Sequence, residues 1–126
     1  MLLKLLTENN LLLGHIIEGI LAKKGQEIVD IDLTKINSII CDHFIICHAE
    51  SRTQVNAIAD SVEDKVFENA KIKVGHREGM ENAMWILLDY FDVVVHIFQK
   101  EARNYYKLEE LWGDANISRV EESFIN

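Results

Sequence analysis

The chain has 126 residues, of which 48% are hydrophobic, and this length and composition suit one domain with one core. It contains no proline, which excludes a proline-rich linker or stalk, and 21 acidic residues against 13 Lys and Arg give a formal charge of −8. No basic stripe runs along the chain, so the composition indicates no broad nucleic-acid binding, and the acidic charge favours a basic partner.

The apolar start of the chain is interrupted by polar residues, among them Lys4 and Glu8. A signal peptide needs an unbroken apolar stretch of about 7–15 residues, and a membrane span needs about 20 apolar residues. Neither pattern is present, so we expect a cytosolic protein. Cys41 and Cys47 lie beside or within an apolar stretch and are expected to be reduced packing residues.

The first half of the chain shows a helix, two strands and a second helix. Residues 10–24 have the apolar spacing of one helix face, and residues 27–33 alternate like a half-exposed strand. Residues 44–47 are apolar without alternation, as in a strand buried on both faces. Ser51 and Gln54 form a capping box, which predicts that the second helix begins there.

The second half is predicted to contain an edge strand with lysines on one side, the two strands of a hairpin, and a helix: residues 71–76, 82–90, 93–99 and 100–112. The resulting order is α-β-β-α-β-β-β-α. It predicts an α/β fold, a mixed β-sheet with helices packed on it, in a single domain. That domain occupies residues 1–113, and residues 114–126 are expected to form a flexible, frayed tail.

The hairpin is expected to have two chemically different faces. A two-residue turn at 91–92 pairs Leu87 with His96. One face is then nearly all apolar and should pack against helices: Met84, Ile86, Leu88, Tyr90, Val93, Val95 and Ile97. The other combines large aromatics with a carboxylate and an imidazole: Trp85, Leu87, Asp89, Val94, His96 and Phe98. This mixture is typical of a protein interface, in which aromatic anchors supply most of the binding energy.

The sequence supports an enzyme active site less well than it supports a protein interface. Asp89 and His96 share a face but are not directly paired, and no nucleophile lies nearby in sequence. The histidines are scattered over several elements, so no metal site and no cofactor are predicted. Asp30 and Asp32 share one strand face, as do the Mg²⁺-binding carboxylates of nucleotidyltransferases. Because the chain has no Gly-Ser dipeptide to grip phosphate, we interpret this pair as solvated, and a Mg-dependent nucleotidyltransferase is kept as the alternative.

The chain carries an ordered series of motifs that also occur in a known family: Asp42-His43-Phe44-Ile45-Ile46, Ser51-Arg52-x-Gln54-Val55, Glu78-Gly79, Trp85, Asp89-Tyr90, Asp92-Val93-Val94-Val95-His96-Ile97-Phe98, Arg103, Tyr106, Leu108-Glu109 and Leu111-Trp112. Over roughly residues 10 to 115 the sequence resembles the Iojap-related ribosomal silencing factors, the RsfS family. It departs from the family pattern at His43, where Tyr is usual, and at Phe91, where Gly is usual.

The resemblance implies a nucleotidyltransferase-like topology without polymerase-type chemistry, and therefore no enzyme. It also implies binding to large-ribosomal-subunit protein fourteen, which blocks joining with the small subunit and represses translation under nutrient limitation. Combined with the two-faced hairpin, it predicts the partner-binding residues Trp85, Asp89, Tyr90, His96, Phe98, Glu101 and Arg103. Tyr90 is included on the resemblance alone, because the strand pairing places it on the apolar face.

Several of these residues can also be explained by contacts within the folded chain, without a partner. Trp85 and Phe98 can pack under a helix, and His96 can be an ordinary strand histidine. Glu101 can be a solvated helix residue, and Arg103 can pair with acidic neighbours on its helix. The Trp85 face can also be the seam of a homodimer. Three further residues are expected to close the core beneath the last helix: Tyr106, Leu111 and Trp112.

Overall fold

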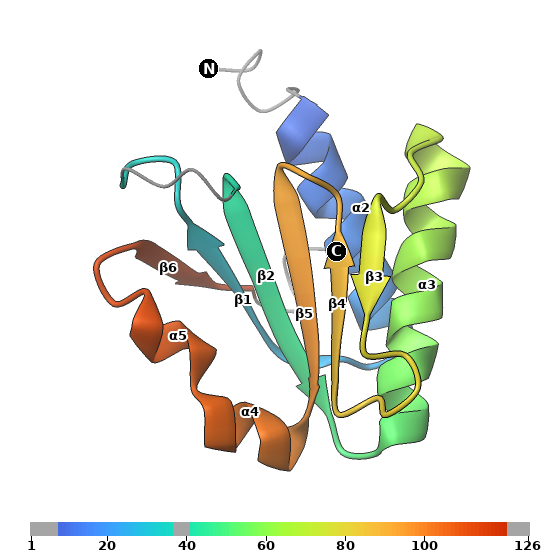
Figure 1. Cartoon of the computed structure of the whole chain (residues 1–126). Helices are drawn as coiled ribbons and strands as arrows, with labels where there is room; N and C mark the ends of the chain where they lie inside the picture. The colour runs from blue at the N-terminus through green and yellow to red at the C-terminus, as the bar shows by residue number, and fades with distance from the viewer. Residues whose placement is uncertain (1–7, 37–40, 121–126) are drawn as a thin grey trace.

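The computed structural model describes residues 8–36 and 41–120, which form helices on the two faces of one six-stranded sheet (Figure 1). The predicted element order is confirmed, and two short elements, α5 and β6, follow it. The elements are α2 (Glu8–Ala22), β1 (Gln26–Asp32), β2 (His43–Ala49), α3 (Arg52–Ala70), β3 (His76–Glu78), β4 (Trp85–Asp89), β5 (Val93–Gln99), α4 (Lys100–Tyr106), α5 (Leu108–Leu111) and β6 (Asn116–Arg119).

The sheet is mixed, as predicted, with the strand order β3-β4-β5-β2-β1-β6. β2 and β5 pair in parallel at its centre, and every other neighbouring pair is antiparallel. Parallel neighbours need a crossover connection, and α3 with the β3–β4 unit supplies it. The β4–β5 hairpin has the predicted register, with Leu87 opposite His96 and Trp85 opposite Phe98.

The hairpin closes through the predicted two-residue turn, but with a strained backbone. Tyr90 N–H donates to the Val93 carbonyl at 2.9 Å, and Asp92 N–H donates to the Tyr90 carbonyl at 2.9 Å. The second bond spans only three residues around Phe91, whose φ is +72°, so this is the rare, strained form of γ-turn. The Asp89 carboxylate accepts the Phe91 N–H at 2.7 Å and helps to hold the turn.

Helices cover the two faces of the sheet unequally. α2 and α3 pack on one face, where the core includes Ile16, Ile58 and Ile97. The shorter α4 and α5 lie at the other face, where Phe44, Phe98 and Leu108 pack together. Figure 1 shows α4 and α5 at the lower left and α3 at the far right. Across residues 8–36 and 41–120, no helix has the length and apolar character that a membrane crossing needs.

Three element boundaries differ from the prediction. The edge strand lies at His76–Glu78 rather than at 71–76. The helix predicted for 100–112 is divided at Lys107, which has φ +48° and ends α4 in a left-handed conformation. Part of the predicted tail, Asn116–Arg119, is the strand β6, which pairs with β1. Residues 121–126 lie outside the described part of the chain.

The start of α3 and the apolar hairpin face also need small corrections. Ser51 caps the helix by accepting the Gln54 N–H at 3.1 Å, as predicted. The Gln54 side chain, however, donates to the Lys23 carbonyl at 3.1 Å, so only half of the expected capping box is present and the other half ties α3 to α2. Met84 was expected in the core and is 40% exposed.

Candidate partner-binding face

Trp85 is the centre of an aromatic cluster on the sheet face that α4 and α5 cover. Its ring stacks on Phe98 with the centroids 4.7 Å apart, and the Tyr106 ring centroid is 4.9 Å away. The indole Nε1 donates a hydrogen bond of 3.0 Å to Nδ1 of His96. The stack and the hydrogen bond fix the indole in one orientation while part of it stays exposed.

His96 can hold Trp85 only in its neutral form. Because its Nδ1 accepts the indole N–H, its proton is on Nε2, which is buried and has no hydrogen-bond partner among residues 8–36 and 41–120. The Phe44 ring meets the imidazole edge-on, with the centroids 4.8 Å apart. Burial lowers the pKa of His96 to about 4. A protonated imidazole has no acceptor, so the orientation of Trp85 depends on this low pKa.

We expect His96 to make the protein less stable at pH 5 than at pH 7. The unfolded histidine titrates near 6.5 and the folded one near 4, so the unfolded chain takes up the extra proton between these values. The stabilising contribution is therefore complete above pH ~6.5 and decreases by about 2 kcal/mol at pH 5. Urea unfolding at the two pH values should show this decrease in the wild type and not in His96→Asn, whose amide oxygen can still accept from Trp85.

Two other histidines contribute to the pH dependence with opposite signs. Burial and the nearby Arg103 lower the pKa of His48, so its contribution is also lost as the pH falls. The hydrogen bond that His43 donates to the Asp30 carboxylate raises the pKa of His43, so its contribution is present at low pH and is lost as the pH rises. Both histidines remain in His96→Asn, so the difference in pH dependence between the wild type and this variant reports the contribution of His96 alone. Identical pH dependence in the two would contradict the prediction.

The outer side of the Trp85 cluster forms a surface that we name the contact face: Glu78, Trp85, Leu87, Asp89 and Tyr106. Strand alternation puts its three β4 residues on one side, and the β3–β4 pairing sets Glu78 opposite Leu87. Tyr106 is 51% exposed, and its neighbour Tyr105 is 80% exposed. A hollow of about 320 Å³ lies beside the indole, between Glu78, Gly79 and Leu87. The contact face thus combines aromatic and aliphatic surface with two carboxylates.

Three of the residues predicted to bind a partner are buried in the folded chain. Phe98 is 0% exposed and His96 is 4% exposed. Tyr90 is 4% exposed on the opposite face, among the α2 and α3 residues, and burial raises the pKa of its phenol. None of these three side chains is exposed on the surface of the folded chain. For Phe98 and His96 the packing alternative holds, and they support Trp85 from beneath.

The two acidic residues predicted for the interface do reach the surface. Asp89 is partly exposed at the end of β4, on the same side as Trp85. Glu101 is exposed in the first turn of α4, and a hydrogen bond from the Gln99 side chain lowers the pKa of its carboxyl. It lies four residues before Tyr105 and so on the same side of the helix. Both side chains thus reach the surface, although the Asp89 carboxylate also accepts the Phe91 N–H and the Glu101 carboxylate also accepts from the Gln99 amide.

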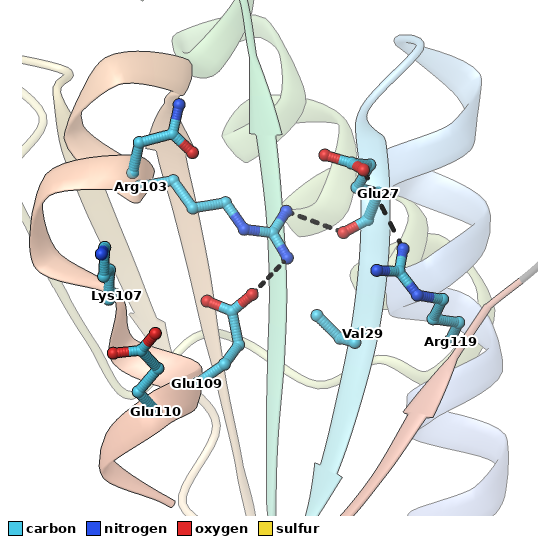
Figure 2. Close-up of a pocket in the computed structure, with 8 residues that line it drawn as sticks. Glu27, Val29, Arg103, Lys107, Glu109, Glu110 and Arg119 are labelled. Carbon is cyan, nitrogen blue, oxygen red and sulfur yellow. Dashed lines mark hydrogen bonds and ion pairs between the residues drawn. The ribbon is translucent and has the colours of Figure 1, made fainter. Parts of the chain in front are cut away.

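Arg103 has a structural role instead, and Figure 2 shows its bonds to Glu27 and Glu109. Its side chain is buried, and one terminal nitrogen donates to the Glu27 carbonyl at 2.7 Å and to His48 Nδ1 at 3.0 Å. The other donates to the Glu109 carboxylate at 2.9 Å. These bonds join α4, α5, β1 and β2. Arg103 therefore positions the helix that carries Tyr106, and the prediction that it contacts a partner is not supported by its burial.

The guanidinium borders a pocket of about 390 Å³ between α4, α5 and the β1–β6 edge (Figure 2). Three cations and three carboxylates line it: Arg103, Lys107, Arg119, Glu27, Glu109 and Glu110. Opposite charges pair within this lining, since the Arg119 and Glu27 side chains lie 3.9 Å apart and Arg103 binds Glu109. The pocket is balanced in charge, and we assign it no ligand.

Asp30 and Asp32, the carboxylates that the nucleotidyltransferase alternative requires, each contact a neighbouring residue of the chain. Asp30 lies 2.8 Å from Nδ1 of His43 on β2. Asp32 accepts the backbone N–H of Thr34 at 2.9 Å. Within the described ranges, no group of three or more His, Cys, Asp or Glu side chains is arranged to hold a metal ion. These contacts give both carboxylates a structural role.

Sequence patterns missed part of the exposed surface on α4 and α5. Tyr106 and Leu111 were expected to close the core, but they are 51% and 75% exposed. Trp112 does pack inward, with its ring centroid 5.6 Å from that of Phe44. The chain changes direction at Lys107, and because no Gly or Asn marks that position, periodicity alone could not place the break.

Comparison with known proteins identifies relatives over almost the whole chain. Residues 7–125 match the family described as "RsfS: Ribosomal silencing factor during starvation". The ribosomal silencing factor RsfS of Bacillus subtilis is 44% identical over 79% of this chain and 82% of its own, and that of Halalkalibacterium halodurans is 42% identical over 90% and 95%. The chloroplast protein Iojap of Zea mays is 38% identical over 75% of this chain and 42% of its own.

Solved structures agree with these matches. A crystal structure of a Chromobacterium violaceum protein superimposes with a TM-score of 0.80, at 34% identity over 85% of this chain and 88% of that one. A crystal structure of a Bacillus halodurans protein does so with a TM-score of 0.73, at 39% identity over 87% and 96%. With the fold, the motif series and these relatives in agreement, the chain belongs to the RsfS family of ribosomal silencing factors.

Proposed function

We propose that this protein acts in the cytosol by docking on the large ribosomal subunit, through large-subunit protein fourteen, and excluding the small subunit. The observation that carries the proposal is the contact face, where a partly exposed Trp85 is fixed by Phe98 and His96 beside two carboxylates. The relatives are named ribosomal silencing factors, which supports a ribosomal partner. Blocking is steric and requires no chemistry.

The contact face suits a basic protein partner. Fixed aromatic rings bury area on docking without losing much side-chain freedom, and so serve as anchors. Asp89 and Glu78 can then meet cationic side chains at the edge of the contact, together with Glu101 on α4. The formal charge of −8 would steer the protein toward a basic surface and increase the association rate at low salt.

We expect Trp85→Ala and Tyr106→Ala each to weaken inhibition of subunit joining about thirtyfold, the loss of an anchor worth about 2 kcal/mol. Joining is followed by light scattering with purified Bacillus subtilis subunits, because that source has a relative 44% identical to this chain. Tyr106 is half exposed, so its truncation should leave the fold intact, and thermal melting of both variants checks this.

Two control variants should inhibit joining as well as the wild type. Leu11→Ala removes a side chain that is 48% exposed on α2, in the opposite layer, and Tyr90→Phe removes a buried hydroxyl on that side. Full inhibition by Trp85→Ala and Tyr106→Ala would move the docking surface elsewhere. Failure of the wild type to inhibit would reject the silencing proposal.

Two alternatives have their own tests. A homodimer through the contact face predicts that Trp85→Ala halves the molar mass in solution while inhibition persists. The nucleotidyltransferase alternative predicts that nucleotide with Mg²⁺ raises the melting temperature and that Asp30→Asn abolishes the increase. We favour docking because Asp30 and Asp32 are already bound by His43 and Thr34.

A further inference from the structure

A short basic segment stands out in this acidic protein. Residues 65–77 contain four of the 13 Lys and Arg residues and only one of the 21 acidic ones, although the chain carries a formal charge of −8. The segment includes the end of α3 and the connection to β3. It is too short to appear as a basic stripe, but it concentrates positive charge at one place in the fold.

The segment forms an exposed basic and aromatic surface, which we name the lysine–phenylalanine patch: Phe67, Lys71, Ile72 and Lys73. Phe67 is 43% exposed and Ile72 is 37% exposed. The ammonium groups of Lys71 and Lys73 lie 5.5 Å and 5.9 Å from the centroid of the Phe67 ring. An accessible ring and two cations are thus held within one small area.

The backbone maintains this arrangement. α3 ends at Ala70, and Lys71 follows with φ +58°, its N–H donating to the Phe67 carbonyl at 3.0 Å. This left-handed position favours glycine, which would end the helix with less strain. Lysines near a helix C-terminus also complement its dipole. That effect accounts for the charge of Lys71 and Lys73 but not for the exposed Phe67 ring that both ammonium groups approach.

We propose that the lysine–phenylalanine patch binds single-stranded RNA, with backbone phosphates on Lys71 and Lys73 and a base stacked on Phe67. Sequence-tolerant sites for single strands combine cations that follow the backbone with aromatic rings on which bases stack. An acidic peptide would use the lysines and leave the ring without a stacking partner. The guanidinium of the neighbouring Arg77 is paired with the Glu63 carboxylate at 2.8 Å, so the positive charge that attracts phosphate comes from the two lysines.

The patch shares no residue with the contact face. It lies at the end of α3, at the upper right of Figure 1, and the chain then leads into β3, where His76 pairs with Asp89 of the contact face. The inference does not depend on the proposed docking to a ribosomal protein, and an assay with RNA alone tests it.

The test is fluorescence anisotropy with a 12-nucleotide oligouridine probe at low salt, using the full chain. The wild type should bind with an affinity that falls as salt rises. The Lys71→Gln, Lys73→Gln double variant should bind at least tenfold more weakly and lower the log–log salt slope by about 1.4, since each single-strand phosphate contact contributes about 0.7. Phe67→Ala should weaken binding about tenfold and leave the slope unchanged, because it removes only stacking.

The matched control is Lys23→Gln, Lys24→Gln. These lysines also follow the end of a helix, Lys24 has φ +61°, and both are exposed, but among residues 8–36 and 41–120 neither ammonium group lies over an aromatic ring. The control should bind like the wild type. Equal effects of the two lysine pairs, or no binding by the wild type at low salt, would overturn the proposal. Dependence on Lys71 and Lys73 without dependence on Phe67, with equal binding of polyglutamate, would assign the patch to an acidic peptide.

Discussion

Gly79→Ala is expected to destabilise the protein by about 3 kcal/mol or more, a value in the range of severe single substitutions. Gly79 has φ +86°, a conformation that costs an alanine energy at any site. A Cβ at this position would also overlap the carbonyl oxygen of Trp85. That oxygen belongs to the backbone of β4, so no side-chain rotation can relieve the overlap.

The same substitution at another glycine supplies the control. Gly14 lies within α2, and a Cβ there would meet nothing within 4 Å. Gly14→Ala should therefore stabilise the protein by about 0.5–1 kcal/mol, because alanine is the better helix former. Urea unfolding of both variants measures the two effects. A loss below about 1 kcal/mol in Gly79→Ala would show that the β3–β4 connection can shift to accept a side chain.

Replacing Arg103 with methionine is expected to cost about 3 kcal/mol, near the lower end for breaking a buried ion pair. The change removes the hydrogen bonds to Glu27, His48 and Glu109, and with them the connection that positions α4. It leaves the Glu109 carboxylate and the Glu27 carbonyl without their donor. Methionine fills a similar volume, so the loss reports the polar contacts rather than a cavity.

Arg119→Met is the matched control, because Arg119 lines the same pocket and pairs with the side chain of Glu27. Its side chain is 75% exposed, and an exposed ion pair is worth at most about 1 kcal/mol. Denaturant unfolding should separate the two variants clearly. Equal, small losses in both would mean that α4 is held by apolar packing alone and that Arg103 is available to a partner after all.

Strand alternation was enough to predict the hairpin correctly. The β4–β5 register follows from the period of two and a two-residue turn, and the structure confirms it at Trp85 and Phe98. Alternation could not show which of those side chains a partner would reach. Phe98 and Trp85 are paired across one face, but the former is fully buried beneath α4 and the latter is partly exposed.

Other features left no readable pattern in the sequence. β6 has the sequence Asn-Ile-Ser-Arg, too short and too polar to show a strand period, and it forms only because β1 offers it an open edge. The turn at Phe91 was located correctly, but its positive φ was not expected, and the break at Lys107 likewise places a non-glycine residue at positive φ. Tertiary contacts impose these conformations against local preference, so local preference could not predict them.

The parallel pairing of β2 with β5 has a consequence for synthesis of the protein. His43 pairs with Val93, so the sheet cannot be completed until a long intervening segment has left the ribosome. Contacts between such distant residues form late and slow the folding of a chain. The contact face also needs Tyr106, which follows β5. A newly made copy would therefore lack the complete contact face until most of its sequence has emerged from the ribosome.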